Sequence, residues 1–223
     1  MKFSIIILIL FSISLKAQSD QKDEEKTFPS LNSGIVYSQS SEELLKEAVN
    51  HFDGKRYELC LDYLQQAVKV NKNSELSDIL YYYQSLTFLK LKKTTESLNA
   101  IDQAIILNSN KNNYYSLRVE LLIQLGEFNR AEADISIILS KDTQNEWALL
   151  YKGILQHKRG LLKEALQSYN FLINKNASNP DAYFYRAMLL LEAGVADRGC
   201  EDLNKAETLG NPEAKNIRTQ YCR

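Results

Sequence analysis

Apolar residues recur at helical spacing along most of the chain, and three glycines interrupt this pattern at a fixed interval. In the stretch QLGEFNRAEADI, apolar residues lie three or four positions apart on both sides of Gly126, as expected of amphipathic helices. Gly160 and Gly194 interrupt similar patterns, so the three glycines stand 34 residues apart. A small residue follows each glycine five positions later: Ala131, Ala165 and Gly199. The pattern predicts pairs of helices joined by a turn at each glycine.

Other positions repeat in step with these glycines. Eleven residues before each glycine stands an aromatic residue or leucine, seven before it a small residue, and nine after it an apolar residue. These residues are Tyr115, Leu149 and Tyr183, then Val119, Gly153 and Ala187, then Ile135, Tyr169 and Leu203. One period earlier, Lys92 stands where the glycine would be. Self-similarity at a fixed period indicates a tandem-repeat architecture.

This pattern resembles the tetratricopeptide repeat, whose units are 34-residue helical hairpins. The resemblance covers residues 41–211 and implies an all-α fold, a right-handed α-solenoid of about five hairpins. Pro180 and Pro212 match the proline common near the end of such units. A C-terminal capping helix is expected over residues 212–223. The expected units are about 41–77, 78–111, 112–145, 146–179 and 180–211.

The N-terminus has the pattern of a secretory leader. Lys2 precedes an almost unbroken run of Ile, Leu and Phe over residues 3–15, and Ala17 ends the segment. This run is shorter than the roughly 20 residues of a membrane-spanning helix. We therefore expect a signal peptide over residues 1–17, with an uncleaved anchor as the alternative. No cysteine precedes Cys60, which excludes a lipid anchor on a cysteine directly after the leader. The mature protein is expected to be periplasmic or secreted, without a membrane span.

Composition and charge narrow the classes of partner. Residues 18–40 are polar and lack helical periodicity, so they predict a flexible arm. Removal of the leader takes away Lys2 and Lys16 and changes the formal net charge from -1 to -3. This balance offers no excess positive charge for phosphates, so nucleic acid is not an expected partner. The sequence has two histidines, His51 and His157. It contains no metalloprotease, nucleophile-elbow or phosphate-loop motif. We expect no enzyme activity, no cofactor and no metal.

The first helix of each expected unit has one face that packs and another that points toward a shared groove. Positions 2, 5, 9 and 12 of these helices lie on the second face, where the side chains at 5, 9 and 12 are mostly apolar or aromatic. Such a surface is typical of a site for a peptide or helix. The alternative is that these side chains fill gaps between adjacent helices. The candidate groove residues are Tyr82, Leu86, Ser116, Glu120, Leu150, Ile154, His157, Phe184 and Met188.

Position 7 of the first helices carries Gln84, Arg118, Lys152 and Arg186. An aspartate stands sixteen residues after each arginine, whereas Ser168 and Ala100 stand sixteen after Lys152 and Gln84. Partly buried arginine favours a carboxylate partner. We therefore predict ion pairs that tie together the two helices of one hairpin. The predicted pairs are Arg118–Asp134 and Arg186–Asp202.

The cysteines suggest a covalent link at the C-terminus. In the expected array, Cys200 lies near the start of the last second helix, and Cys222 lies on the terminal helix that folds back over it. An oxidising compartment permits a Cys200–Cys222 disulfide, and two separate core thiols are the alternative. The ending also resembles terminal repeats of exported bacterial proteins of this family. Cys60 occupies a small-residue position and is expected to be a buried thiol.

These observations lead to two functional hypotheses. The first is a non-enzymatic interaction module that binds a peptide or helix of an envelope or export partner in an apolar and aromatic groove. The second is a structural component of an envelope complex that assembles with copies of itself. The size of the mature protein at increasing concentration would separate the two.

Overall fold

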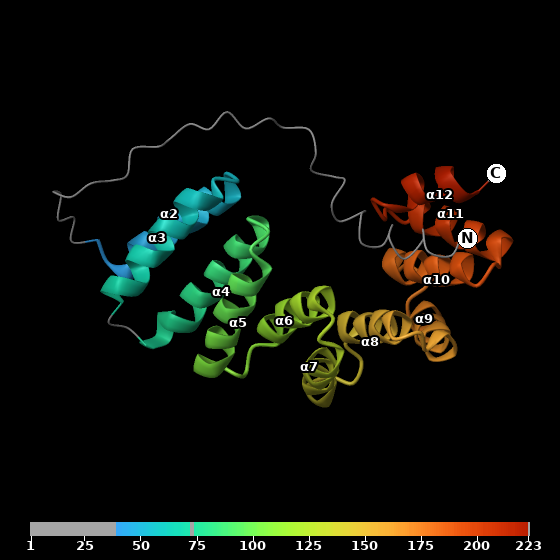
Figure 1. Ribbon diagram of the computed structural model, residues 1–223, viewed down its shortest axis with the longest axis horizontal. Coiled ribbons are helices and arrows are strands. Elements are labelled where there is room, and N and C mark those ends of the chain that lie inside the picture. Colours follow the sequence, from blue (N-terminus) through green and yellow to red (C-terminus); the bar gives the residue numbers. More distant parts are fainter. Residues whose placement is uncertain (1–38, 72–73, 223) are drawn as a thin grey trace.

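The computed structural model describes residues 39–71 and 74–222. The expected leader, and the expected arm up to residue 38, lie outside these residues. The described part is entirely helical (Figure 1), which confirms the expected fold class. Its helices are α2 (Ser41–Asp53), α3 (Tyr57–Val70), α4 (Ser74–Lys90), α5 (Thr94–Leu107), α6 (Asn112–Leu125), α7 (Phe128–Lys141), α8 (Glu146–Lys158), α9 (Leu162–Lys175), α10 (Pro180–Glu192), α11 (Ala196–Thr208) and α12 (Ala214–Tyr221).

The helices follow one another along the length of the molecule as a stack of hairpins (Figure 1). Each helix packs against the next one in sequence, and first helices also contact first helices of neighbouring hairpins, as α6 does with α8 and α8 with α10. A hairpin cannot bury its apolar face alone, so stacking provides the continuous core of a solenoid. One expected boundary is wrong. The second hairpin begins inside the unit assigned to residues 41–77, because α4 already starts at Ser74.

Left-handed backbone makes the turns within the hairpins. Gly126, Gly160 and Gly194 have φ values of 76°, 77° and 79°, a region that glycine reaches without a Cβ penalty. Lys92, in the corresponding turn of the second hairpin, adopts φ 59°. The turn geometry is therefore a property of the repeat, and glycine is the residue that forms it with least strain.

Small residues allow the two helices of a hairpin to approach closely. In the fourth hairpin, the Tyr169 ring packs so tightly over Gly153 that a Cβ there would lie 2.7 Å from Cε1 of the ring. In the second hairpin, Ser85 and Ser97 occupy the contact, and each hydroxyl donates to the other residue's carbonyl, at 2.9 and 2.8 Å. These bonds satisfy two fully buried hydroxyls, which would otherwise be unfavourable in the core.

The terminal helix α12 closes the apolar end of the stack. Ala214 and Ile217 are fully buried in a cluster with Phe184 and Leu203. Arg218 Nε donates to Glu207 Oε2 of α11 at 2.7 Å. The sulfur atoms of Cys200 and Cys222 are 1.98 Å apart, at bonding distance. Within the described ranges, no helix has both the length and the apolar content needed to cross a bilayer.

Candidate protein-binding surface

Four of the candidate groove residues belong to the core. Leu150, Ile154, Phe184 and Met188 are only 2–6% exposed, so the expectation that they form an open binding surface is corrected. Leu150 and Ile154 lie in one cluster with Ala182 and Leu189 of α10. Phe184 and Met188 pack with α11 and α12. Because adjacent first helices contact one another, these side chains fill the space between units.

The other five candidates are partly buried. Tyr82 packs against Tyr114 with ring centroids 4.9 Å apart, and Leu86 lies against the same core cluster. Ser116 donates to the backbone carbonyl of Asn112 at 3.1 Å. Glu120 and His157, whose side chain is only 8% exposed, are hydrogen-bonded to residues of neighbouring hairpins. The structure thus divides the nine predicted residues between core and surface.

Three further aromatic residues of the first helices form a partly exposed surface, with Tyr151 and Tyr185 at position 6 and Trp147 at position 2. We call Trp147, Tyr151 and Tyr185 the aromatic surface. Tyr151 and Tyr185 both pack against the core cluster shared by α8 and α10 while remaining partly exposed. Trp147 stacks on Tyr151, one helical turn away, with ring centroids 4.0 Å apart. The sequence signal was the tyrosine at position 6 of both helices, which the assignment of positions 2, 5, 9 and 12 to the groove missed.

Hydrogen bonds connect this surface to neighbouring hairpins. Tyr151 donates its hydroxyl to Glu120 Oε1 of α6 at 2.9 Å. On α8, His157 Nε2 lies 2.9 Å from Glu192 Oε2 of α10. At the start of α10, Asp181 accepts from the Asn211 amide at 2.8 Å. The surface therefore spans several hairpins and has polar groups at its edges.

Burial and negative charge both act on the two tyrosines. Burial raises the pKa of Tyr185 to about 12, with further contributions from Glu213, Asp181 and Glu120. The pKa of Tyr151 is raised by burial and then by Glu120, Tyr185 and Asp181. Both phenols are therefore neutral hydrogen-bond donors near neutral pH. Glu120 and Asp181 contribute to the raised pKa of both tyrosines, so the two rings share one electrostatic environment.

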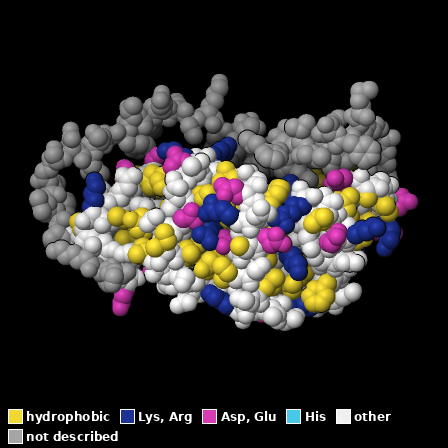
Figure 2. Space-filling model, turned by 60° about the horizontal axis from the view of Figure 1, so that its bottom comes forward, with side chains coloured by type: hydrophobic (Ala, Val, Ile, Leu, Met, Phe, Trp, Pro, Cys, Tyr) yellow, Lys and Arg dark blue, Asp and Glu magenta, His cyan; other side chains and the backbone are white. Residues whose placement is uncertain are grey.

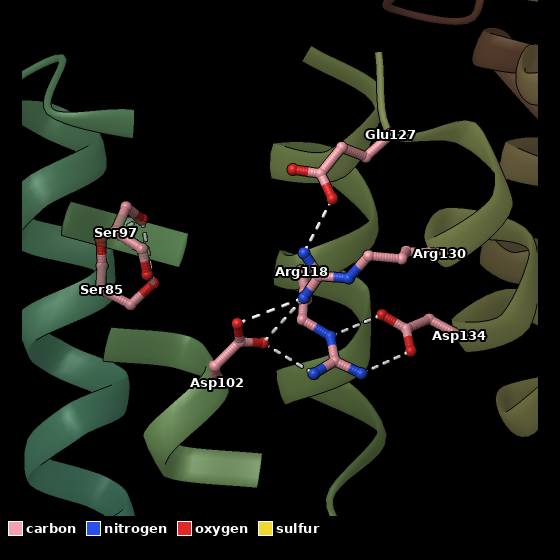
Figure 3. A network of polar contacts seen from close by, with 7 residues as sticks. All are labelled: Ser85, Ser97, Asp102, Arg118, Glu127, Arg130 and Asp134. Carbon is pink, nitrogen blue, oxygen red and sulfur yellow. Dashed lines mark hydrogen bonds and ion pairs between the residues drawn. The ribbon is translucent and has the colours of Figure 1, made fainter. Parts of the chain in front are cut away.

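The predicted arginines lie away from this surface, in polar networks between helices. Arg118 donates Nε and Nη2 to the two oxygens of Asp134, each at 2.7 Å, and Nη1 to Asp102 Oδ1 at 2.7 Å. Asp134 belongs to the same hairpin, but Asp102 belongs to the preceding one. Arg130 lies 3.2 Å from Asp102 and 2.8 Å from Glu127. Figure 3 shows Arg118 held between the two aspartates.

Arg186 repeats this arrangement in the last hairpin. Its Nε and Nη2 donate to Asp202 at 2.7 Å, and its Nη1 donates to Asn170 Oδ1 of the preceding hairpin at 2.7 Å. Asp102 and Asn170 each stand sixteen residues before their arginine, a signal that the prediction did not use. Each arginine thus connects three helices and two repeats.

Lys152 departs from this pattern in the fourth hairpin. Its side chain is exposed, and beside it is an open cavity of about 420 Å³. Serines stand sixteen residues before and after Lys152, so it has no carboxylate at the corresponding positions. The cavity is lined by Leu149, Lys152, Gln156, Glu164, Gln167, Ser168 and Phe171.

Charges of both signs are mixed on the outside. Figure 2 shows one face on which small hydrophobic patches are separated by acidic and basic side chains. Across residues 39–71 and 74–222, no group of three His, Cys, Asp or Glu side chains is placed to hold a metal ion. The arrangement with the clearest binding chemistry is therefore the aromatic surface and its carboxylates.

Comparisons with known sequences find repeat proteins. No protein-family model matches the chain. A TPR repeat-containing protein of Methanocaldococcus jannaschii is 22% identical over 196 residues, which is 88% of this chain and 32% of that protein. The TPR repeat-containing thioredoxin TDX of Arabidopsis thaliana is 28% identical over 117 residues, 52% of this chain and 29% of that protein. The chain spans less than a third of these curated relatives.

Solved structures share the architecture at low identity. PilW, a widely conserved type IV pilus biogenesis factor, superposes with a TM-score of 0.66 and 16% identity, covering 81% of this chain and 90% of PilW. YrrB, a TPR protein with an unusual peptide-binding site, gives a TM-score of 0.59 and 14% identity, covering 81% and 92%. A thermophilic TPR protein of Thermus thermophilus gives 0.62 and 18%, covering 82% and 97%. At such identities the likeness concerns the fold.

Proposed function

The chain has the tetratricopeptide repeat fold, and from this premise we propose that it is a protein-interaction module whose aromatic surface binds a segment of a partner protein. The observation that carries the proposal is the placement of Trp147, Tyr151 and Tyr185 on neighbouring first helices, partly exposed over a firm core. Tyrosine and tryptophan combine large apolar area with a polar group and few rotatable bonds, and both are enriched where proteins bind partners.

Two comparisons support this reading. YrrB is described as having a peptide-binding site, so the fold is compatible with peptide recognition. PilW is a pilus biogenesis factor, an example of the fold in the assembly of a surface structure. Together with the leader pattern of residues 1–17, this supports an exported module that binds an envelope or export partner without catalysing a reaction.

Self-assembly is the second candidate, and exposed apolar side chains on the second helices favour it. Ile106 of α5 is 74% exposed and Phe171 of α9 is 49% exposed. Phe171 also lines the cavity beside Lys152. Apolar side chains at these positions could pack against another copy of the chain. Sedimentation velocity over a range of concentrations tests this candidate directly.

A peptide selection tests the leading proposal. Random peptides displayed on phage are selected on the purified protein, and the recovered peptides are measured by fluorescence anisotropy. The double variant Tyr151→Ala/Tyr185→Ala is expected to weaken binding about tenfold or more. The matched variant Leu161→Ala/Phe171→Ala, on the second-helix side, is expected to bind normally. Circular dichroism establishes that both variants fold. Loss of binding only in the second variant would contradict the proposal.

A further inference from the structure

We infer that the aromatic surface selects partner segments that present a cationic side chain, preferably arginine, because three carboxylates that form no ion pair among the described residues lie near its two tyrosines. This inference rests on the proposed function and specifies the chemistry of the ligand. The carboxylates belong to Glu120 on α6, Asp181 at the start of α10, and Glu213 directly before α12. Three separate elements therefore direct negative charge toward one aromatic site.

Two of these carboxylates accept hydrogen bonds from neutral groups. Glu120 accepts from the neutral Tyr151 hydroxyl, and Asp181 accepts from the neutral Asn211 amide. In the part of the chain that the structure describes, none of the three lies within ion-pair distance of Lys, Arg or His. This contrasts with Asp134, which is held by Arg118. A charged hydrogen-bond donor stabilises a carboxylate most when the carboxylate is partly shielded from water.

An unpartnered polar atom lies beside the same site. Tyr169 is fully buried, and its hydroxyl oxygen has no hydrogen-bond partner among the described residues. Its ring stacks with that of Tyr185 at a centroid distance of 6.3 Å. A buried hydroxyl without a partner is unusual in native proteins.

Electrostatics agree with this geometry. Burial, and then the charge of Asp181, raises the pKa of Glu213. Burial also raises the pKa of Glu120, while Tyr151 and Lys90 partly oppose the increase. A bound cation would stabilise the charged forms of both carboxylates. The stacked rings of Trp147 and Tyr151 add a face on which a guanidinium can rest.

Two basic residues lie near the ends of the first helices, and one of them, Lys90, acts on Glu120 without forming an ion pair with it. Burial lowers the pKa of Lys158 near the end of α8, and Glu192 opposes that decrease. Lys90 is at the end of α4. The chain's own N-terminal stretch DQKDEEK has more acidic than basic residues, so it does not complement three carboxylates. Charge complementarity therefore favours a separate basic partner as the occupant.

Three labelled peptides test the inference at physiological salt. One alternates glycine and arginine, the second replaces each arginine by neutral citrulline, and the third replaces it by glutamate. Fluorescence anisotropy with the purified protein is expected to show about tenfold tighter binding of the arginine peptide than of the citrulline peptide. The glutamate peptide should be weakest. Equal binding of the arginine and citrulline peptides would overturn the inference.

Charge-neutralising variants locate the effect. Glu213→Gln and Asp181→Asn should each weaken the arginine peptide about threefold, with no change for the citrulline peptide. Asn at position 181 retains an acceptor for Asn211. The control is Glu201→Gln, an exposed residue on α11 that carries the same charge. Equal loss in the control would show a non-specific charge effect and would also overturn the inference.

The experiments can disprove the two proposals independently of each other. If selected neutral peptides bind through Tyr151 and Tyr185 while the carboxylate variants change nothing, the interaction module stands and the cationic preference is wrong. If the arginine peptide binds and the carboxylate variants weaken it, the preference is supported. If no peptide binding depends on Tyr151 and Tyr185, the proposed function itself is wrong.

Discussion

The third and fourth hairpins share one repeat pattern, but different interactions hold their two helices together. In the third, Arg118 connects α6 to Asp134 of α7 and to Asp102 of the preceding hairpin. In the fourth, the corresponding Lys152 is exposed, and the ring of Tyr169 packs onto Gly153 instead. The third hairpin has a charged pair at position 7, whereas the fourth has close ring packing at the following residue, Gly153.

The difference shows that a repeat position has no fixed role. An arginine between two aspartates has its charge compensated and five donors in a geometry that suits carboxylates. A lysine flanked by serines has no such partner and stays in water. An open cavity lies beside Lys152. Stability in a solenoid is a sum of local terms, so the two hairpins should respond differently to matched substitutions.

The largest expected effect is on the charged hairpin. Arg118→Met removes the partner of Asp134, whose side chain is 4% exposed, and should destabilise the protein by about 3 kcal/mol. Lys152→Met, the same change at the exposed site, should alter stability by less than about 0.5 kcal/mol. Urea denaturation followed by circular dichroism measures both.

A double variant separates lost charge from lost packing. Arg118→Met/Asp134→Leu removes the uncompensated carboxylate, so it should recover a large part of the loss. If the double variant is no more stable than Arg118→Met, burial of unpaired Asp134 is not the cause. An equal effect of Arg118→Met and Lys152→Met would remove the contrast between the hairpins.

The next effect is on the packed hairpin. Gly153→Ala would place a Cβ 2.7 Å from the Tyr169 ring, and overpacking of this kind costs about 1–3 kcal/mol. The expected result is a lower urea midpoint despite the better helix propensity of alanine. Adding Tyr169→Leu should relieve the clash, so the alanine should be less harmful in that background. Unchanged stability of Gly153→Ala would mean that the ring moves freely.

Introducing the arginine–aspartate pair of the third hairpin into the fourth should change stability by a smaller amount. Lys152→Arg/Ser168→Asp introduces the arginine and aspartate spacing of the third hairpin into the fourth. Because the new pair is partly exposed, it should add about 1 kcal/mol or less. Lys152→Arg alone should be neutral and is the control. A double variant that is no more stable than this control would show that the local backbone does not permit the pair.

The smallest expected effect lies where the two hairpins meet. Burial raises the pKa of Glu120, so its ionisation opposes folding as pH rises through the folded-state pKa. Glu120→Gln should therefore stabilise the protein at neutral pH, and the difference should vanish in acid, where wild-type Glu120 is protonated. Thermal unfolding across pH measures this. Tyr151→Phe, which removes the hydroxyl donor, should increase the benefit of the substitution. A pH-independent difference would contradict this account.

Much of the fold followed from the sequence because it depends on local spacing. The glycines at 126, 160 and 194 predicted the turns, and the structure places left-handed backbone at each. The spacing of Arg118 and Asp134 indicated a contact within one hairpin, since both residues lie in adjacent helices. The start of α4 was less predictable, because no glycine or proline marks it.

The candidate surface was predicted less well. Helical periodicity separates two faces of an isolated helix, but α8 has neighbours on several sides, in α6, α9 and α10. The offset between successive hairpins decided that Leu150 and Phe184 are buried while Tyr151 and Tyr185 reach the surface. A shift of one position along a helix turns a side chain by about 100°, enough to exchange core and surface.

By itself, the sequence determined the repeat, its period, the turn residues and the pairing of arginine with aspartate inside a hairpin. These features depend on interactions within a single hairpin or on the spacing that repeats from one hairpin to the next. Only the tertiary structure decided which aromatic side chains remain exposed, which carboxylates stay without a cation, and that Arg118 also binds Asp102. The physical reason is that burial and charge compensation depend on how neighbouring hairpins are stacked, and no single repeat contains that information.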